Sequence, residues 1–136
     1  MSIAEVEGFI AREFPQAVET YAIDAVGPMT GRVRMPVGDA HLRPGGTVSG
    51  PTIFALADCA VYYTILAMVG PEALAVTTSA SIDFMRKPAA GRDLVADVTL
   101  LKLGRVLAVG DVAVRSDGDG AVVARATLTY SRPPRR

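Results

Sequence analysis

A single carboxylate within a long apolar stretch is the residue best suited to chemistry. Between Pro44 and Pro71, Asp58 is the only ionisable acid or base apart from Cys59 and two tyrosines. A buried carboxylate without partners is costly, so it must find hydrogen bonds, become neutral or be retained for catalysis. The pattern fits a structural aspartate satisfied by backbone or hydroxyl groups as well as a functional one.

The second chemical feature is the start of the helix predicted for the same stretch. Ser49 or Gly50 can cap this helix, and Pro51 suits its first turn, where the missing N–H is not needed. Gly50 also lets a ligand approach the backbone closely. Free N–H groups and the positive end of the helix dipole could hold an oxyanion here, although plain capping explains the same residues.

These two features lie too far apart on one helix to contact one carbonyl group. Asp58 follows Pro51 by about two turns, roughly 10 Å at 1.5 Å per residue. If both act on one substrate, the helix start must come from a second copy of the chain. On that condition, the sequence predicts a site shared between two subunits.

Two helices are predicted from the apolar periodicity. Apolar residues three and four apart predict an amphipathic N-terminal helix within residues 1–15, with Ser2 as its cap and Pro15 after its end. The apolar stretch predicts a central helix over about 50–69, stopped by Gly70-Pro71. Because this central helix is apolar on all sides, we expect other structure to wrap it.

Strands are predicted on both sides of the central helix. Alternating apolar and polar residues and strong turn signals place them at 21–26, 31–37, 77–85, 94–103, 106–115 and 121–131, with a loop over 38–50. This order describes one α+β domain over residues 1–136, in which an antiparallel sheet wraps a central helix.

The composition limits which classes of binding partner and which cellular location we expect. The chain has 14 basic and 14 acidic residues, so its net charge gives no reason to expect nucleic acid or an anionic membrane as partner. One cysteine excludes an intramolecular disulfide, and an N-terminus without a basic region argues against a secretory signal. A central carboxylate argues against a membrane span in the apolar stretch. We expect a cytoplasmic protein.

From Gly50 to Asp58 the chain reads Gly-Pro-Thr-Ile-Phe-Ala-Leu-Ala-Asp. This run resembles the helix-start motif of the hotdog thioesterases, His-Gly-Gly followed by a short apolar run and Leu-Ala-Asp. Segments 77–88, 104–105 and 117–127 resemble successive strands of the phenylacetyl-CoA thioesterase-like branch. The resemblance implies a hotdog fold, a homodimer or dimer of dimers, and hydrolysis of an acyl-CoA. It implies no cofactor, because coenzyme A is part of the substrate.

The resemblance also implies roles for individual residues. Asp58 falls on the family's catalytic carboxylate, which acts as general base for water or as nucleophile. Gly50 falls on the glycine whose N–H, donated by the opposite subunit, polarises the thioester carbonyl. Thr77 falls near a hydroxyl residue that helps to place the water.

Three positions depart from the family's pattern. The usual His is Ser49, which can still donate a hydrogen bond, and the second Gly is Pro51, which cannot. An Asn common upstream is missing, and Arg43 stands at about that place, either as a substrate partner or as a solvated loop charge. These changes bear on rate and substrate more than on fold.

Other side chains are candidates for substrate contact. Phe54 and Tyr62 lie one turn before and after Asp58, where they could line an acyl pocket or pack in the core. In this family, basic residues at strand ends can meet the phosphates of coenzyme A. The residues at such places here are Arg86, Lys87, Arg92 and Arg105, although each one alone is more often a solvated charge.

The two remaining side chains that could react, a cysteine and a histidine, have simpler interpretations. Cys59 should point about 100° away from Asp58 around the helix, as an inert core thiol. His41, the only histidine, is assigned a structural or surface role, which counts against a hotdog dehydratase. The sequence predicts a thioesterase for a small, medium-chain or aromatic acyl-CoA. The alternatives are an acyl-CoA binding or scaffolding protein and, third, a hotdog dehydratase or hydratase.

Overall fold

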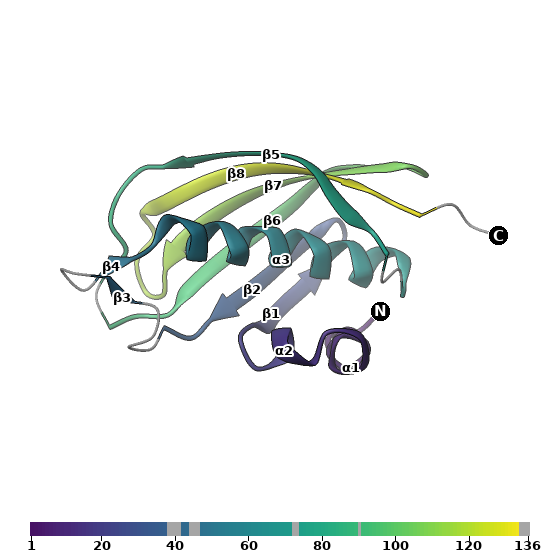
Figure 1. The fold of residues 1–136 in the computed structure, drawn as a ribbon, viewed down its shortest axis with the longest axis horizontal. Helices are drawn as coiled ribbons and strands as arrows, with labels where there is room; N and C mark the ends of the chain where they lie inside the picture. Colours follow the sequence, from purple (N-terminus) through teal and green to yellow (C-terminus); the bar gives the residue numbers. More distant parts are fainter. Residues whose placement is uncertain (38–41, 44–46, 72–73, 90, 134–136) are drawn as a thin grey trace.

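A curved antiparallel sheet and the helix lying across it dominate the computed structural model, which describes residues 1–37, 42–43, 47–71, 74–89 and 91–133 (Figure 1). The sheet has six strands in the order β1-β2-β6-β7-β8-β5. They are β1 (Ala22–Gly27), β2 (Thr30–Met35), β5 (Val76–Phe84), β6 (Leu94–Leu103), β7 (Leu107–Ser116) and β8 (Val122–Ser131). The predicted α+β architecture is confirmed.

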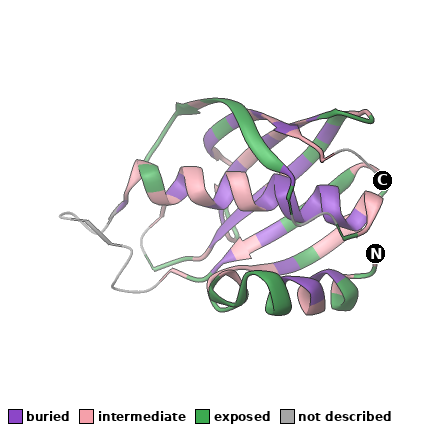
Figure 2. Ribbon diagram, turned by 45° about the vertical axis from the view of Figure 1, so that its right-hand side comes forward, coloured by how far each residue is buried: buried purple, intermediate pink, exposed green. Residues whose placement is uncertain are grey.

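The central helix α3 (Gly50–Val69) crosses the concave face of the sheet. Ser49 caps its start, and Gly70, with a φ of 91° that suits glycine, ends it as predicted. With a mean hydropathy of 1.8, α3 is long and apolar enough to cross a membrane, but 61% of that stretch is buried inside the protein. This burial is the behaviour expected of a core helix (Figure 2).

Two glycines let the sheet approach α3 closely. A Cβ at Gly31 of β2 would overlap the side chain of Thr64, and one at Gly110 of β7 would lie 2.9 Å from the methyl groups of Val61. Thr64 itself is buried and donates its hydroxyl to the carbonyl of Ala60 at 2.8 Å. The C-terminal half of the helix is therefore fixed against the sheet at two points.

The N-terminal helix α1 (Ile3–Glu13) begins with the predicted cap. Ser2 and Glu5 form a reciprocal capping box, and the buried face of α1 packs against β1 and α3. The chain then continues into a short helix α2 (Pro15–Val18), which the sequence analysis did not predict. Pro15 ends α1 but suits the first turn of the next helix.

The segment predicted as a loop before α3 contains two short paired strands. These are β3 (Leu42–Arg43) and β4 (Thr47–Val48), so the prediction of a loop is wrong at these residues. Strands of two residues carry no alternation that a sequence pattern could reveal. His41 lies outside the described residues.

The two edges of the main sheet differ in exposure. β1, at one edge, contacts α1, whereas β5 forms the other edge with eight of its nine residues exposed (Figure 2). A long uncharged edge strand is a ready template for pairing with another chain. Only Asp83 near the end of β5 carries a charge.

Candidate functional site

Two hydroxyl groups converge on one oxygen of Asp58. Thr77 Oγ1 donates to Asp58 Oδ1 at 2.6 Å, and Tyr130 Oη donates to the same oxygen at 2.7 Å. Tyr130 Oη also lies 3.0 Å from the backbone carbonyl oxygen of Asp58. Among the described residues, no hydrogen bond reaches Oδ2 of Asp58. The described residues therefore hold the carboxylate by one oxygen only.

A β-bulge brings Thr77 to this carboxylate. Thr77 is the cross-strand partner of Tyr130, and Ala80 is the partner of Leu128, with a register shift between Thr77 and Ser79. Ala80 faces α3, so without the bulge every second residue before it in β5 would also face α3. Residue 78 would then face the helix and Thr77 would face the outer side of the sheet. The extra residue reverses this, so that Thr77 and Tyr130 face Asp58 together.

Aromatic side chains line the space in front of Asp58, which we call the carboxylate cleft. It has a volume of about 260 Å³, and its lining includes Phe14, Cys59, Tyr62, Thr77 and Tyr130. The ring of Tyr62 stacks on that of Tyr130 at 6.0 Å between centroids, and Phe14 meets Tyr62 edge-on at 5.9 Å. The cleft is thus apolar and flat-walled, with the carboxylate as its charged group.

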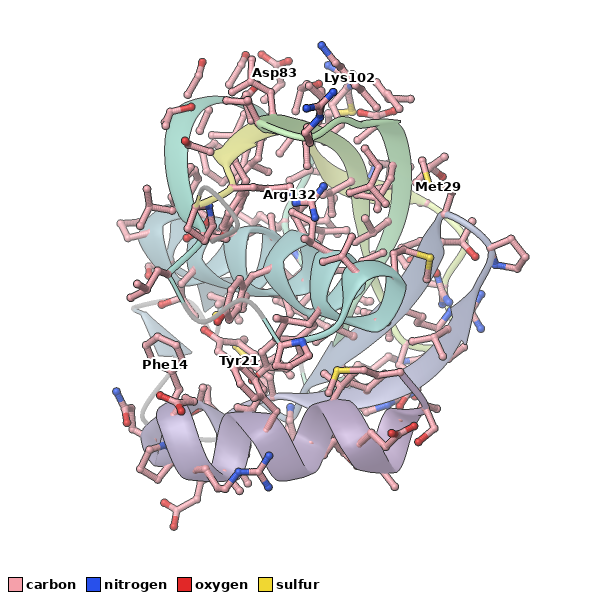
Figure 3. All side chains as sticks on the ribbon, turned by 90° about the vertical axis from the view of Figure 1, so that its right-hand side faces the viewer. Phe14, Tyr21, Met29, Asp83, Lys102 and Arg132 are labelled. Atoms are coloured by element: carbon pink, nitrogen blue, oxygen red, sulfur yellow. The ribbon has the colours of Figure 1, made fainter. Side chains whose placement is uncertain are left out.

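Burial keeps the phenols and the thiol around the carboxylate cleft protonated. Burial raises the pKa of Tyr62 and of Tyr21 to about 12. The side chain of Tyr21 lies between α3 and α1 (Figure 3). Burial, and then the charge of Asp58, raise the pKa of Tyr130 well above its usual range and that of Cys59 to about 11. Cys59 is therefore a thiol and a poor nucleophile at neutral pH.

The start of α3 lies in a second depression, the helix-start cleft, of about 460 Å³. Gly50 forms part of it, and a Cβ at Gly50 would lie 3.2 Å from the ring of Phe84. Arg86 and Lys87 line the same cleft. The Ser49 hydroxyl serves the cap: it accepts the N–H of Thr52 at 3.3 Å and contacts its hydroxyl at 2.8 Å.

The two clefts share no lining residue. Asp58 follows Gly50 by eight positions, about 12 Å along the helix axis. One subunit therefore brings Thr77 and Tyr62 to Asp58, and Arg86 and Lys87 to Gly50, but it does not bring the two sets together.

The other candidate residues lie apart from the clefts. Phe54 packs against the hydrophobic core, and Arg105 is exposed in the turn between β6 and β7; neither lines a cleft. Arg43 lies in β3, and its side chain is outside the described residues.

Tyr130 is the site residue that the sequence analysis missed. Its side chain is 4% exposed and lies on the inward face of β8 with Ala124, Ala126 and Leu128. The alternation of that strand could have identified Tyr130 as an inward polar side chain. It could not have shown that the hydroxyl meets a residue 72 positions earlier in the chain.

Comparisons with known proteins agree with this architecture. Residues 45–123 match the family model of the thioesterase superfamily. The chain is 34% identical to a Deinococcus radiodurans protein named "Putative esterase", over 90% of this chain and 80% of that protein. It is 53% identical to a structure named as a "putative thioesterase" from Silicibacter sp. TM1040, covering 98% of this chain and 93% of that one, with a TM-score of 0.92.

Two further structures extend the comparison. The phenylacetic acid degradation protein PaaI from Thermus thermophilus is 31% identical, over 88% of this chain and 98% of that chain, with a TM-score of 0.72. A hypothetical thioesterase protein from Streptococcus pneumoniae, solved with coenzyme A, shares the fold at 23% identity, with a TM-score of 0.75 over 96% of this chain and 98% of that one. The chain thus belongs to the thioesterase superfamily, with the hotdog fold, and is a thioester hydrolase.

Proposed function

We propose that the protein hydrolyses a small, medium-chain or aromatic acyl-CoA at a site composed of Asp58 from one subunit and the helix start of its partner. The observation that carries this proposal is the carboxylate of Asp58, held by Oδ1 at the wall of an apolar cleft with Oδ2 available. Such a group can act on a water molecule or on the substrate itself.

The reaction needs one group that accepts a proton and one hydrogen-bond donor that stabilises the oxyanion. As general base, Asp58 takes a proton from water, the water oxygen attacks the thioester carbon, the C–S bond breaks, and the proton passes to the departing thiolate. As nucleophile, Asp58 attacks the thioester carbon, the C–S bond breaks and the thiolate of coenzyme A leaves, which gives a mixed anhydride on Asp58. Water then hydrolyses this anhydride to the free acid and the Asp58 carboxylate, and the proton that it releases passes to the thiolate. In both routes the Gly50 N–H stabilises the negative charge that develops on the carbonyl oxygen.

The path of β5 supports a site shared between two subunits. Its first residues include Thr77, at the carboxylate cleft, and it ends at Phe84, beside Gly50 in the helix-start cleft. If two copies pair antiparallel along this exposed edge, the Thr77 end of one β5 lies opposite the Phe84 end of the other. Asp58 of one subunit would then face Gly50 of its partner.

The two clefts suit the two parts of an acyl-CoA. Arg86 and Lys87 beside Gly50 are suited to the phosphates of coenzyme A, because cationic side chains form charge-assisted hydrogen bonds with phosphate oxygens. The carboxylate cleft, at about 260 Å³, holds roughly eight or nine water volumes of about 30 Å³. That size and the aromatic walls favour a short or single-ring acyl group over a long chain.

A panel of acyl-CoAs tests the proposal by release of free thiol. We expect turnover of at least one short or aromatic ester, and its loss in Asp58→Asn. The matched control is Asp111→Asn, which removes a partly exposed carboxylate of β7 that lines neither cleft and should leave turnover intact. Equal turnover by wild type and Asp58→Asn would refute the role of Asp58.

A second candidate function is binding of acyl-CoA with only weak hydrolysis. It is favoured by Pro51, which has no N–H to donate, and by the engagement of the Ser49 hydroxyl in the helix cap. Tight binding of several esters by wild type, with thiol release from each far slower than dissociation of the intact ester, would support this candidate over efficient hydrolysis.

A further inference from the structure

Tyr130 contacts the carboxylate but is not part of the helix-start motif. We propose that Tyr130 is a positioning residue that, with Thr77, fixes Asp58 through Oδ1 and thereby makes Oδ2 the oxygen that reacts. This inference rests on the proposed function, since it assigns a role to a residue acting through Asp58.

The hydrogen bonds make the two oxygens of Asp58 unequal. An aspartate side chain turns readily about its last torsion, so a carboxylate without partners presents either oxygen. Here both donors, at 2.6 and 2.7 Å, meet Oδ1. Tilting the carboxylate away from Thr77 and Tyr130 would break two charge-assisted bonds at once, so one oxygen stays with these donors and the other is left for the reaction.

The Tyr130 side chain is itself held in place. It is 4% exposed, and its ring stacks on Tyr62 with an interplanar angle of 16°. Phe14, which Figure 3 labels, lies at the junction of α1 and α2. Its ring packs edge-on against Tyr62 at an interplanar angle of 87°. The N-terminal helices therefore support the carboxylate through two aromatic contacts, although they contribute no hydrogen bond to it among the described residues.

The phenol also has the protonation state that this role needs. Burial first, and the charge of Asp58 second, raise the pKa of Tyr130 well above its usual range. Tyr130 is therefore a hydrogen-bond donor throughout the neutral range and does not compete with Asp58 as a base.

The test is Tyr130→Phe, compared with Tyr21→Phe. The first variant removes the hydroxyl that meets Asp58 and keeps the ring. The second removes a phenol hydroxyl from a residue that lines neither cleft. We expect Tyr130→Phe to lower kcat by about ten- to hundredfold, the loss typical of one hydrogen bond to a charged group, with KM changed by less than about threefold. Tyr21→Phe should retain wild-type kcat and KM.

Three outcomes separate the explanations. If Tyr130→Phe and Tyr21→Phe both retain wild-type kcat while Asp58→Asn is inactive, the inference is wrong and the proposed function stands. If Asp58→Asn is active, the proposed function fails. If Tyr130→Phe raises KM as much as it lowers kcat, or if its loss of kcat disappears when the assay is run well below its own melting temperature, the role is structural and the inference is wrong.

Discussion

Replacing Thr77 by valine removes one hydroxyl from the carboxylate cleft and leaves the shape of the side chain nearly unchanged. Thr77 Oγ1 lies 2.6 Å from Asp58 Oδ1, a short bond to a charged acceptor. Such bonds contribute about 1.5–3 kcal/mol, and the exposure of Thr77 places this one at the lower end. If the bond orients the reacting carboxylate, a loss of about 1.5 kcal/mol lowers kcat by roughly tenfold.

The neighbouring residue provides a matched control. Thr78 lies on the same exposed edge strand, but its hydroxyl faces the carbonyl of Thr129 at 3.3 Å instead of Asp58. Thr78→Val should therefore retain wild-type kcat. Thr78→Val should unfold within about 0.5 kcal/mol of wild type, as surface substitutions usually do, whereas Thr77→Val should lose up to about 1.5 kcal/mol with its bond to the carboxylate.

Thiol release and thermal unfolding measure these effects on the same preparations. The reasoning predicts that Thr77→Val loses rate and Thr78→Val does not, with both variants fully folded at the assay temperature. Equal rates for the two variants would refute it, because the β-bulge would then have no bearing on the carboxylate. The reverse order would mean that the register of β5 differs from the one described.

Three further predictions concern stability and reactivity. Gly31→Ala should destabilise the fold by about 1–3 kcal/mol in denaturant unfolding, because the new Cβ would overlap the buried Thr64; a wild-type midpoint would argue against that contact. Tyr63→Phe should raise the free energy of unfolding by up to about 1 kcal/mol, since it removes a buried hydroxyl without a partner in the described structure, and a loss of stability would indicate an unseen partner. Burial raises the pKa of Cys59 to about 11, so its thiolate is scarce at pH 8: iodoacetamide should modify it more slowly than the same thiol in the unfolded chain until the pH approaches 11, and equal rates at pH 8 would contradict this.

Much of the fold could be predicted because its elements are long and regular. The predicted strand 94–103 coincides with β6, and the predicted central helix 50–69 coincides with α3. Both have unbroken patterns and clear ends. The paired strands β3 and β4 and the helix α2 were missed, because elements of two to four residues have no period to detect.

The candidate site was only partly predictable, for a different reason. Asp58 is visible in the sequence because a charge within an apolar run needs an explanation. The convergence of Thr77 and Tyr130 on Oδ1 depends on a one-residue bulge and on a pairing between β5 and β8. These contacts join residues that are distant in the chain, and no local pattern specifies them.

The most direct test of a shared site is the activity of a mixed dimer. One subunit carries Asp58→Asn, and the other carries Gly50→Val, which places a branched side chain in the helix-start cleft beside Phe84. Two affinity tags isolate the mixed dimer, and each variant is also assayed as its own homodimer. If Asp58 works with Gly50 of the partner, one of the two sites is intact, so the mixed dimer should recover about half of wild-type turnover from two inactive parents. A mixed dimer as inactive as its parents would contradict the account, because each subunit would then need its own Asp58 and its own Gly50.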